Sequence, residues 1–79
     1  MVRGGETYQH EEITVKIVEV APIRHFSGRK ELMISYQIID GRYVSPVAHF
    51  WMSESADIRE KIREIVEYYK KIKSSILGR

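Results

Sequence analysis

The feature that most constrains the fold is an apolar stripe in the last third of the chain. Its members are separated by four, three, four, three and four residues, the spacing of one face of an α-helix. They are Ile58, Ile62, Ile65, Tyr69, Ile72 and Ile76. Most of the positions between them are charged, as expected on the solvent side of such a helix. We therefore predict a helix over about residues 54–76, with Ser53 or Ser55 as its N-cap.

Three earlier segments have the two-residue alternation of β-strands, over about residues 12–21, 31–39 and 43–52. In the first of them the apolar positions change face after Ile17. This change predicts a bulge or a similar irregularity near Ile17–Val18. Pro22 is expected to end that strand, because the segment that follows it, up to Lys30, is rich in basic and turn-forming residues, which indicates a connecting loop.

The third strand is expected to lie at an edge of the sheet or to be bulged, since Pro46 has no N–H for a β ladder. Asp40-Gly41 precedes it and is a strong hairpin signal. Alternation along this strand places Tyr43, His49 and Trp51 on one face.

Together these elements predict one α+β domain over residues 11–79. We expect a three-stranded antiparallel meander packed by one long C-terminal helix. Residues 1–10 have two adjacent glycines and no apolar period, so we expect them to form a flexible arm.

Composition narrows the class of protein. The chain has 79 residues and no cysteine, which excludes a disulfide framework and a cysteine-based zinc site. No uncharged run is long enough to span a bilayer, and the first residues do not have the pattern of a signal peptide, so we expect a cytoplasmic protein without a membrane partner. The absence of asparagine and the abundance of charged residues are typical of a thermophile.

Catalytic patterns are missing from the sequence. The three histidines are scattered, no two carboxylates fall on a predicted interior face, and phosphate-loop, dinucleotide and zinc-protease motifs do not occur. We therefore predict no enzyme activity, no cofactor and no metal site. A small enzyme built on His25 and His49 remains the weakest alternative.

Aromatic and basic residues gather in the middle of the chain, a combination that suits single-stranded nucleic acid, because bases stack on aromatic rings and cations contact phosphates. The predicted binding residues are Arg24, Phe26, Arg29, Lys30, Tyr36, Arg42, Tyr43, His49 and Trp51. The alternative interpretation is that these aromatic side chains pack the sheet and that the charged loop is merely solvated.

The helix stripe is also a candidate dimer seam, because a small core gains from self-association. The predicted interface residues are Ile62, Ile65, Tyr69, Ile72 and Ile76. A monomer that uses the whole stripe against its own sheet is the competing arrangement.

Phe50-Trp51, at the exit from the strands into a long charged helix over Ser53–Ile76, together with the heat-adapted composition, resembles the small archaeal relatives of the ThermoDBP family. This resemblance covers roughly residues 12–76 in layout. It implies binding of single-stranded DNA in a cleft of apolar and basic residues, and self-association.

The sequence therefore favours a small protein that binds single-stranded DNA or RNA with little sequence preference. The alternative is a protein-interaction module or small complex subunit. Such a module would dock through the Ile58–Ile76 stripe or through the edge strand that contains Pro46.

Overall fold

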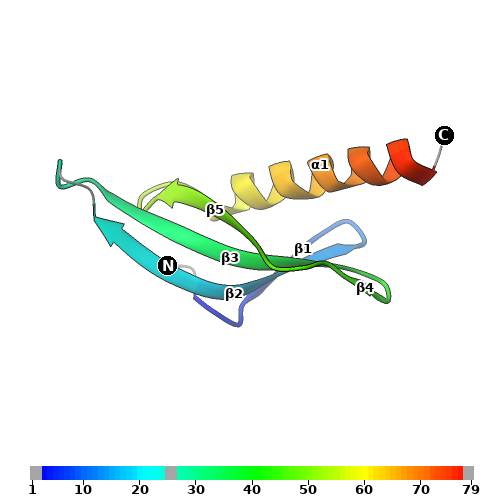
Figure 1. The fold of residues 1–79 in the computed structure, drawn as a ribbon, viewed down its shortest axis with the longest axis horizontal. Helices are drawn as coiled ribbons and strands as arrows, with labels where there is room; N and C mark the ends of the chain where they lie inside the picture. Colours follow the sequence, from blue (N-terminus) through cyan, green and yellow to red (C-terminus); the bar gives the residue numbers. More distant parts are fainter. Residues whose placement is uncertain (1–2, 25–26, 78–79) are drawn as a thin grey trace.

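The computed structural model describes residues 3–24 and 27–77. It is an α+β structure in which one C-terminal helix lies over one face of an antiparallel sheet (Figure 1). The elements in chain order are β1 (Thr7–His10), β2 (Ile13–Arg24), β3 (Lys30–Asp40), β4 (Tyr43–Val44), β5 (Ala48–Ser53) and α1 (Ile58–Leu77). The sheet order is β1-β2-β3, and both β4 and β5 pair with the edge of β3 that is opposite β2.

The long β2–β3 hairpin forms the centre of the sheet, and its register contains the irregularity predicted from the sequence. Ile17 pairs with Tyr36 and Glu19 pairs with Ser35, so Val18 is an extra residue. This confirms a bulge that returns the apolar side chains after Val18 to the helix-facing side.

The prediction that Pro22 ends this strand is wrong. Pro22 lies opposite Leu32, and β2 continues to Arg24. The reason is that β1 pairs with β2 only as far as Lys16, so the later part of β2 has an open edge that tolerates a residue without an N–H.

The third predicted strand is divided into β4 and β5, as the position of Pro46 suggested. Two hydrogen bonds between Ser45 and β3 stabilise the break between β4 and β5. The Ser45 N–H donates to the Ile38 carbonyl at 2.9 Å, and the Ser45 Oγ accepts from the Ile38 N–H at 2.8 Å. Continuing the register of β4 would set Val47 opposite Tyr36, whereas the structure sets Ala48 there. The one-residue shift exchanges the two faces of the strand.

The segment expected to be a flexible arm contains strand β1. Thr7–His10 pairs with β2 through a tight turn at Glu11-Glu12, in which Glu11 has φ of 57°. Lys70 of the helix donates to the Glu11 carboxylate and so ties this turn to α1. The sheet therefore has more strands than the three predicted.

The core lies between the helix and the sheet. Its buried side chains are Ile13, Val15, Ile17, Leu32, Ile34, Ile38, Met52, Ile62 and Val66. Helix α1 begins at Ile58, later than expected, because Asp57 is the capping residue in place of Ser53 or Ser55. The Asp57 Oδ1 accepts from the Arg59 N–H at 3.0 Å.

The helix lies off-centre on the sheet. Its main contacts with the strands are with β1 and β2. The part of the same face that is formed by β3, β4 and β5 is therefore only partly covered by α1, and several large side chains remain accessible there.

Two isoleucines of α1 test this arrangement. Ile62 is 3% exposed and Ile72 is 40% exposed. We expect Ile62→Ala to lower the free energy of unfolding by about 2–5 kcal/mol, through lost burial and a residual cavity. The matched change Ile72→Ala should cost less than about 1 kcal/mol. Urea denaturation measures both, and equal losses would contradict the off-centre packing.

Candidate nucleic-acid interface

An aromatic groove runs between α1 and the β3–β5 side of the sheet. Its volume is about 560 Å³. We define this aromatic groove by the residues that line it, which are Tyr36, Ile38, Phe50, Lys61, Glu64, Ile65, Tyr68, Tyr69 and Ile72. The sheet supplies the floor of the groove and the helix supplies one wall.

The floor of the groove contains an aromatic pair from neighbouring strands. Tyr36 of β3 and Phe50 of β5 have ring centres 5.6 Å apart, with a tilt of 53° between the rings. Partial burial raises the pKa of Tyr36, so its hydroxyl stays neutral at physiological pH. Lys61 of the helix lies with its Nζ 6.0 Å from the centre of the Phe50 ring, which brings a positive charge to this end of the groove.

The other end of the groove is closed by a second aromatic pair. Tyr43 of β4 stacks on Tyr69 of α1, with ring centres 6.2 Å apart and planes 13° from parallel. The Tyr69 hydroxyl donates to Asp40 Oδ2 at 2.9 Å, and Lys73 Nζ donates to the same oxygen at 2.6 Å. These contacts clamp the helix to the end of β3, and we call Asp40, Tyr69 and Lys73 the Asp40 clamp.

The clamp shifts the ionisation of two of its members. The hydrogen bond from Lys73, and then that from Tyr69, lower the pKa of Asp40. Burial, and then the hydrogen bond to Asp40, raise the pKa of Tyr69 to about 12. Asp40 is thus a carboxylate and Tyr69 a neutral donor over the whole physiological range.

The helix wall presents side chains that the fold itself does not need to bury. Tyr68 is 67% exposed and Ile72 is 40% exposed. Exposed aromatic and aliphatic side chains beside a concave surface indicate a surface for recognition of a ligand or partner.

The structure separates the sequence-predicted binding residues into three places. Tyr36 and Tyr43 lie at the groove, and Arg42 lies in the turn beside Tyr43. His49 and Trp51 lie on the opposite face of the sheet, because they alternate with the core-facing Phe50 and Met52. The expectation that Tyr43, His49 and Trp51 share one face is therefore wrong, and the register shift at Ser45–Val47 is the reason.

The open face of the sheet has its own polar contact. Ser35, which is 4% exposed, is hydrogen-bonded to His49 Nδ1 at 2.9 Å. Trp51 is 55% exposed on this face, opposite Met33. Because the helix covers the other side of the sheet, His49 and Trp51 cannot act in the groove.

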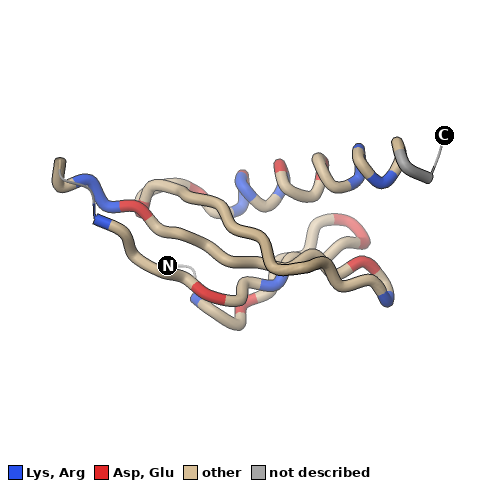
Figure 2. The backbone as a smooth tube through the Cα atoms, viewed as in Figure 1, with Lys and Arg blue, Asp and Glu red and all other residues tan. Residues whose placement is uncertain are grey.

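The third place is the tip of the β2–β3 hairpin, which carries Arg24, Arg29 and Lys30 (Figure 2). Arg24 and Lys30 pair at the base of this tip, and the Glu54 N–H donates to the Lys30 carbonyl at 3.3 Å. Phe26 lies outside the described residues. The hairpin tip is therefore at the end of β5, where Glu31 pairs with Ser53, and it is not part of the groove.

Sequence reasoning missed Phe50, Lys61 and Tyr68 as candidate site residues. Tyr68 falls beside the helix stripe in the sequence, which is a signal that it needs cover. Phe50 and Lys61 carry no such signal in the sequence. They line an accessible groove only because the helix lies off-centre on the sheet.

The predicted dimer residues divide between the core and the groove. Ile62 is buried against the sheet, whereas Ile65, Tyr69 and Ile72 line the groove. Ile76 lies in α1, and its side chain is outside what the structure describes.

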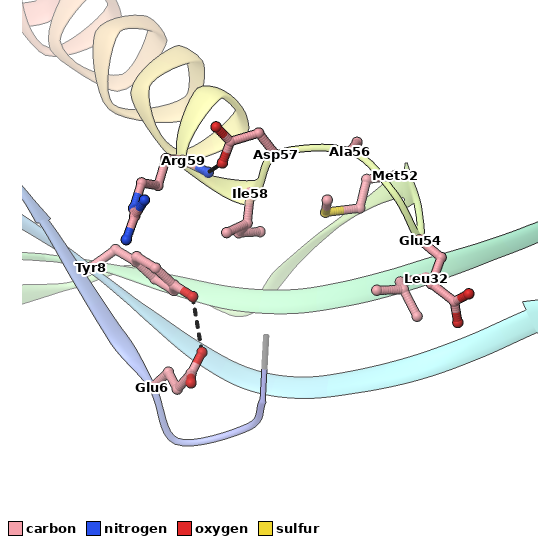
Figure 3. A pocket seen from close by; sticks show the side chains of 9 residues that line it. All are labelled: Glu6, Tyr8, Leu32, Met52, Glu54, Ala56, Asp57, Ile58 and Arg59. Atoms are coloured by element: carbon pink, nitrogen blue, oxygen red, sulfur yellow. Dashed lines mark hydrogen bonds between the residues drawn. The ribbon is translucent and has the colours of Figure 1, made fainter. Parts of the chain in front are cut away.

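A second cavity of about 540 Å³ lies at the start of the helix (Figure 3). Its floor is formed by Leu32, Met52 and Ile58, and its rim includes Tyr8, whose hydroxyl donates to Glu6 at 2.9 Å. Carboxylates predominate on the rim, so this cavity does not suit an anionic ligand.

Over residues 3–24 and 27–77, no three histidine, aspartate or glutamate side chains converge as metal ligands would. The described helix is not long and apolar enough to cross a membrane. No protein-family model matches the chain, and no curated protein or solved structure is significantly similar to it.

The Asp40 clamp leads to a prediction about acid stability. Because the folded-state pKa of Asp40 is below its ordinary value of 3.8, the clamp stabilises the protein above that pH. This stabilisation is lost as the pH falls through the lower folded pKa. We expect wild-type protein to lose stability as the pH falls below about 4, and Asp40→Asn to lose less over the same range. Urea unfolding at each pH measures this, and identical pH profiles would contradict the clamp.

Proposed function

We propose that the protein binds single-stranded nucleic acid in the aromatic groove. The observation that carries this proposal is the concentration of accessible aromatic rings along one groove, from Phe50 and Tyr36 at one end to Tyr69 and Tyr43 at the other. Rings presented in this way are the general means by which proteins bind bases without reading their sequence.

A single strand fits this groove better than a duplex does. The faces of paired bases are covered by their neighbours in a duplex, so only an unpaired strand can place them on the rings. The half-buried tyrosines stay neutral and the groove is largely apolar, which suits the flat surface of a base.

The comparison of two exposed aromatic residues tests the site. We expect Tyr68→Ala to weaken binding of a fluorescein-labelled oligo-dT or oligo-U by about 1–3 kcal/mol, or roughly 5- to 150-fold. The matched change Trp51→Ala, on the open face, should alter the affinity by less than about twofold. Fluorescence anisotropy measures both, and both side chains are exposed enough for the variants to fold.

The same titration has two outcomes that contradict the proposal. Absence of salt-sensitive binding to any single strand would refute nucleic-acid binding. Loss of affinity in Trp51→Ala but not in Tyr68→Ala would move the site to the open face of the sheet.

A second candidate function is docking of protein, which the exposure of Ile72 and Tyr68 on the helix favours. In that case the groove would receive an apolar element from a partner or a second copy. Light scattering of the purified chain tests self-association, because a groove-mediated dimer should become monomeric in Ile72→Glu. A monomeric wild-type protein would contradict the dimer.

A further inference from the structure

We infer that the groove holds a short footprint of about three nucleotides, with Lys61 and Arg42 contacting the phosphates at its two ends. This inference rests on the proposed function. Of the four cations that the sequence favours, it keeps Arg42, leaves out the three of the hairpin tip, and adds Lys61.

The length of the groove sets the footprint. Along the helix wall, Lys61 to Ile72 spans about 16 Å at 1.5 Å per residue. Along β3, from Ile34 opposite Phe50 to Asp40 opposite Tyr43, the floor spans about 20 Å. Same-face strand residues lie about 7 Å apart, a distance of the order of the step between unstacked bases, so about three bases fit.

The number of aromatic positions agrees with this length. Three aromatic surfaces line the groove, namely the Tyr36–Phe50 pair, the Tyr43–Tyr69 pair, and the exposed ring of Tyr68, which precedes Tyr69 on the helix. Each is a surface on which one base can lie.

Two cations lie at the ends of this row of rings. Lys61 is beside Phe50, and its contact with Glu64 is long, at 3.9 Å, and exposed to solvent. Arg42 directly precedes Tyr43 in the turn between β3 and β4, is exposed, and has no ion-pair partner in the part of the chain that the structure describes. Lys73, by contrast, is already engaged by Asp40 at 2.6 Å.

Acidic residues bound the footprint at the end next to Lys61. The turn between β5 and α1 carries Glu54 and Asp57, and Glu54 lies beside Lys30. A phosphate chain leaving the groove in this direction meets two carboxylates before it reaches Arg24 and Lys30. We therefore place the hairpin tip outside the footprint.

The experiment measures affinity against oligonucleotide length and salt. With oligo-dT of two to ten nucleotides, we expect affinity to rise steeply to about four nucleotides and then by less than about twofold per added nucleotide. In a ten-nucleotide ligand, the Arg42→Gln/Lys61→Gln variant should reduce the slope of log affinity against log salt by roughly 1.4, or 0.7 per lost phosphate contact.

A second double variant is the matched control. Arg24→Gln/Lys30→Gln removes the same net charge from exposed positions, and we expect it to leave the slope within about 0.5 of wild type. An equal reduction in both variants, or a steep rise in affinity continuing to ten nucleotides, would overturn the short footprint while leaving the proposed function intact. Failure of wild-type protein to bind even the longest strand would refute both. Circular dichroism confirms folding of each variant.

Discussion

Burial of one sheet face under a single helix is the constraint on which the rest of this structure depends. The sheet is four strand positions wide, so its outer strand axes are about 14 Å apart, whereas a helix with its side chains is about 10 Å across. One helix cannot cover such a face. Because α1 lies nearest β1 and β2, the uncovered part of the sheet face is formed by β3 and β5. The aromatic groove results directly from this difference in width between the helix and the sheet.

The groove is also continuous with the core. Tyr36, Phe50, Ile65 and Tyr69 all pack against the buried cluster while their outer surfaces line the groove. The Asp40 clamp joins the helix to the end of β3 at the place where Tyr43 and Tyr69 stack. The rings are thus held by the same contacts that hold the two layers together, which orders the surface before any ligand arrives.

The local patterns of the sequence were sufficient for the fold class, the helix and the bulge at Val18, because each depends on periodicity along a single segment. Strand β1 could not be predicted in this way, since Glu11-Glu12 is an unusual turn and its ion pair with Lys70 is a tertiary contact. The aromatic site was only partly predictable. Tyr36 and Tyr43 lie at the groove, but a one-residue shift near Pro46 moved Trp51 and His49 to the other face, and the contribution of Tyr68 depends on where the helix rests.

The bulge at Val18 has a consequence for how this sheet can change in evolution. Ile17 and Val20 lie on the buried face, and Val18 is the one residue between Ile17 and Glu19 without a partner on β3. Removing Val18 alone would give a regular ladder in which Ile17, Glu19 and Val20 keep their present faces and partners. The strand can therefore lose a residue at this point without moving any buried side chain to solvent, and relatives that differ in length by one residue here would share the same core.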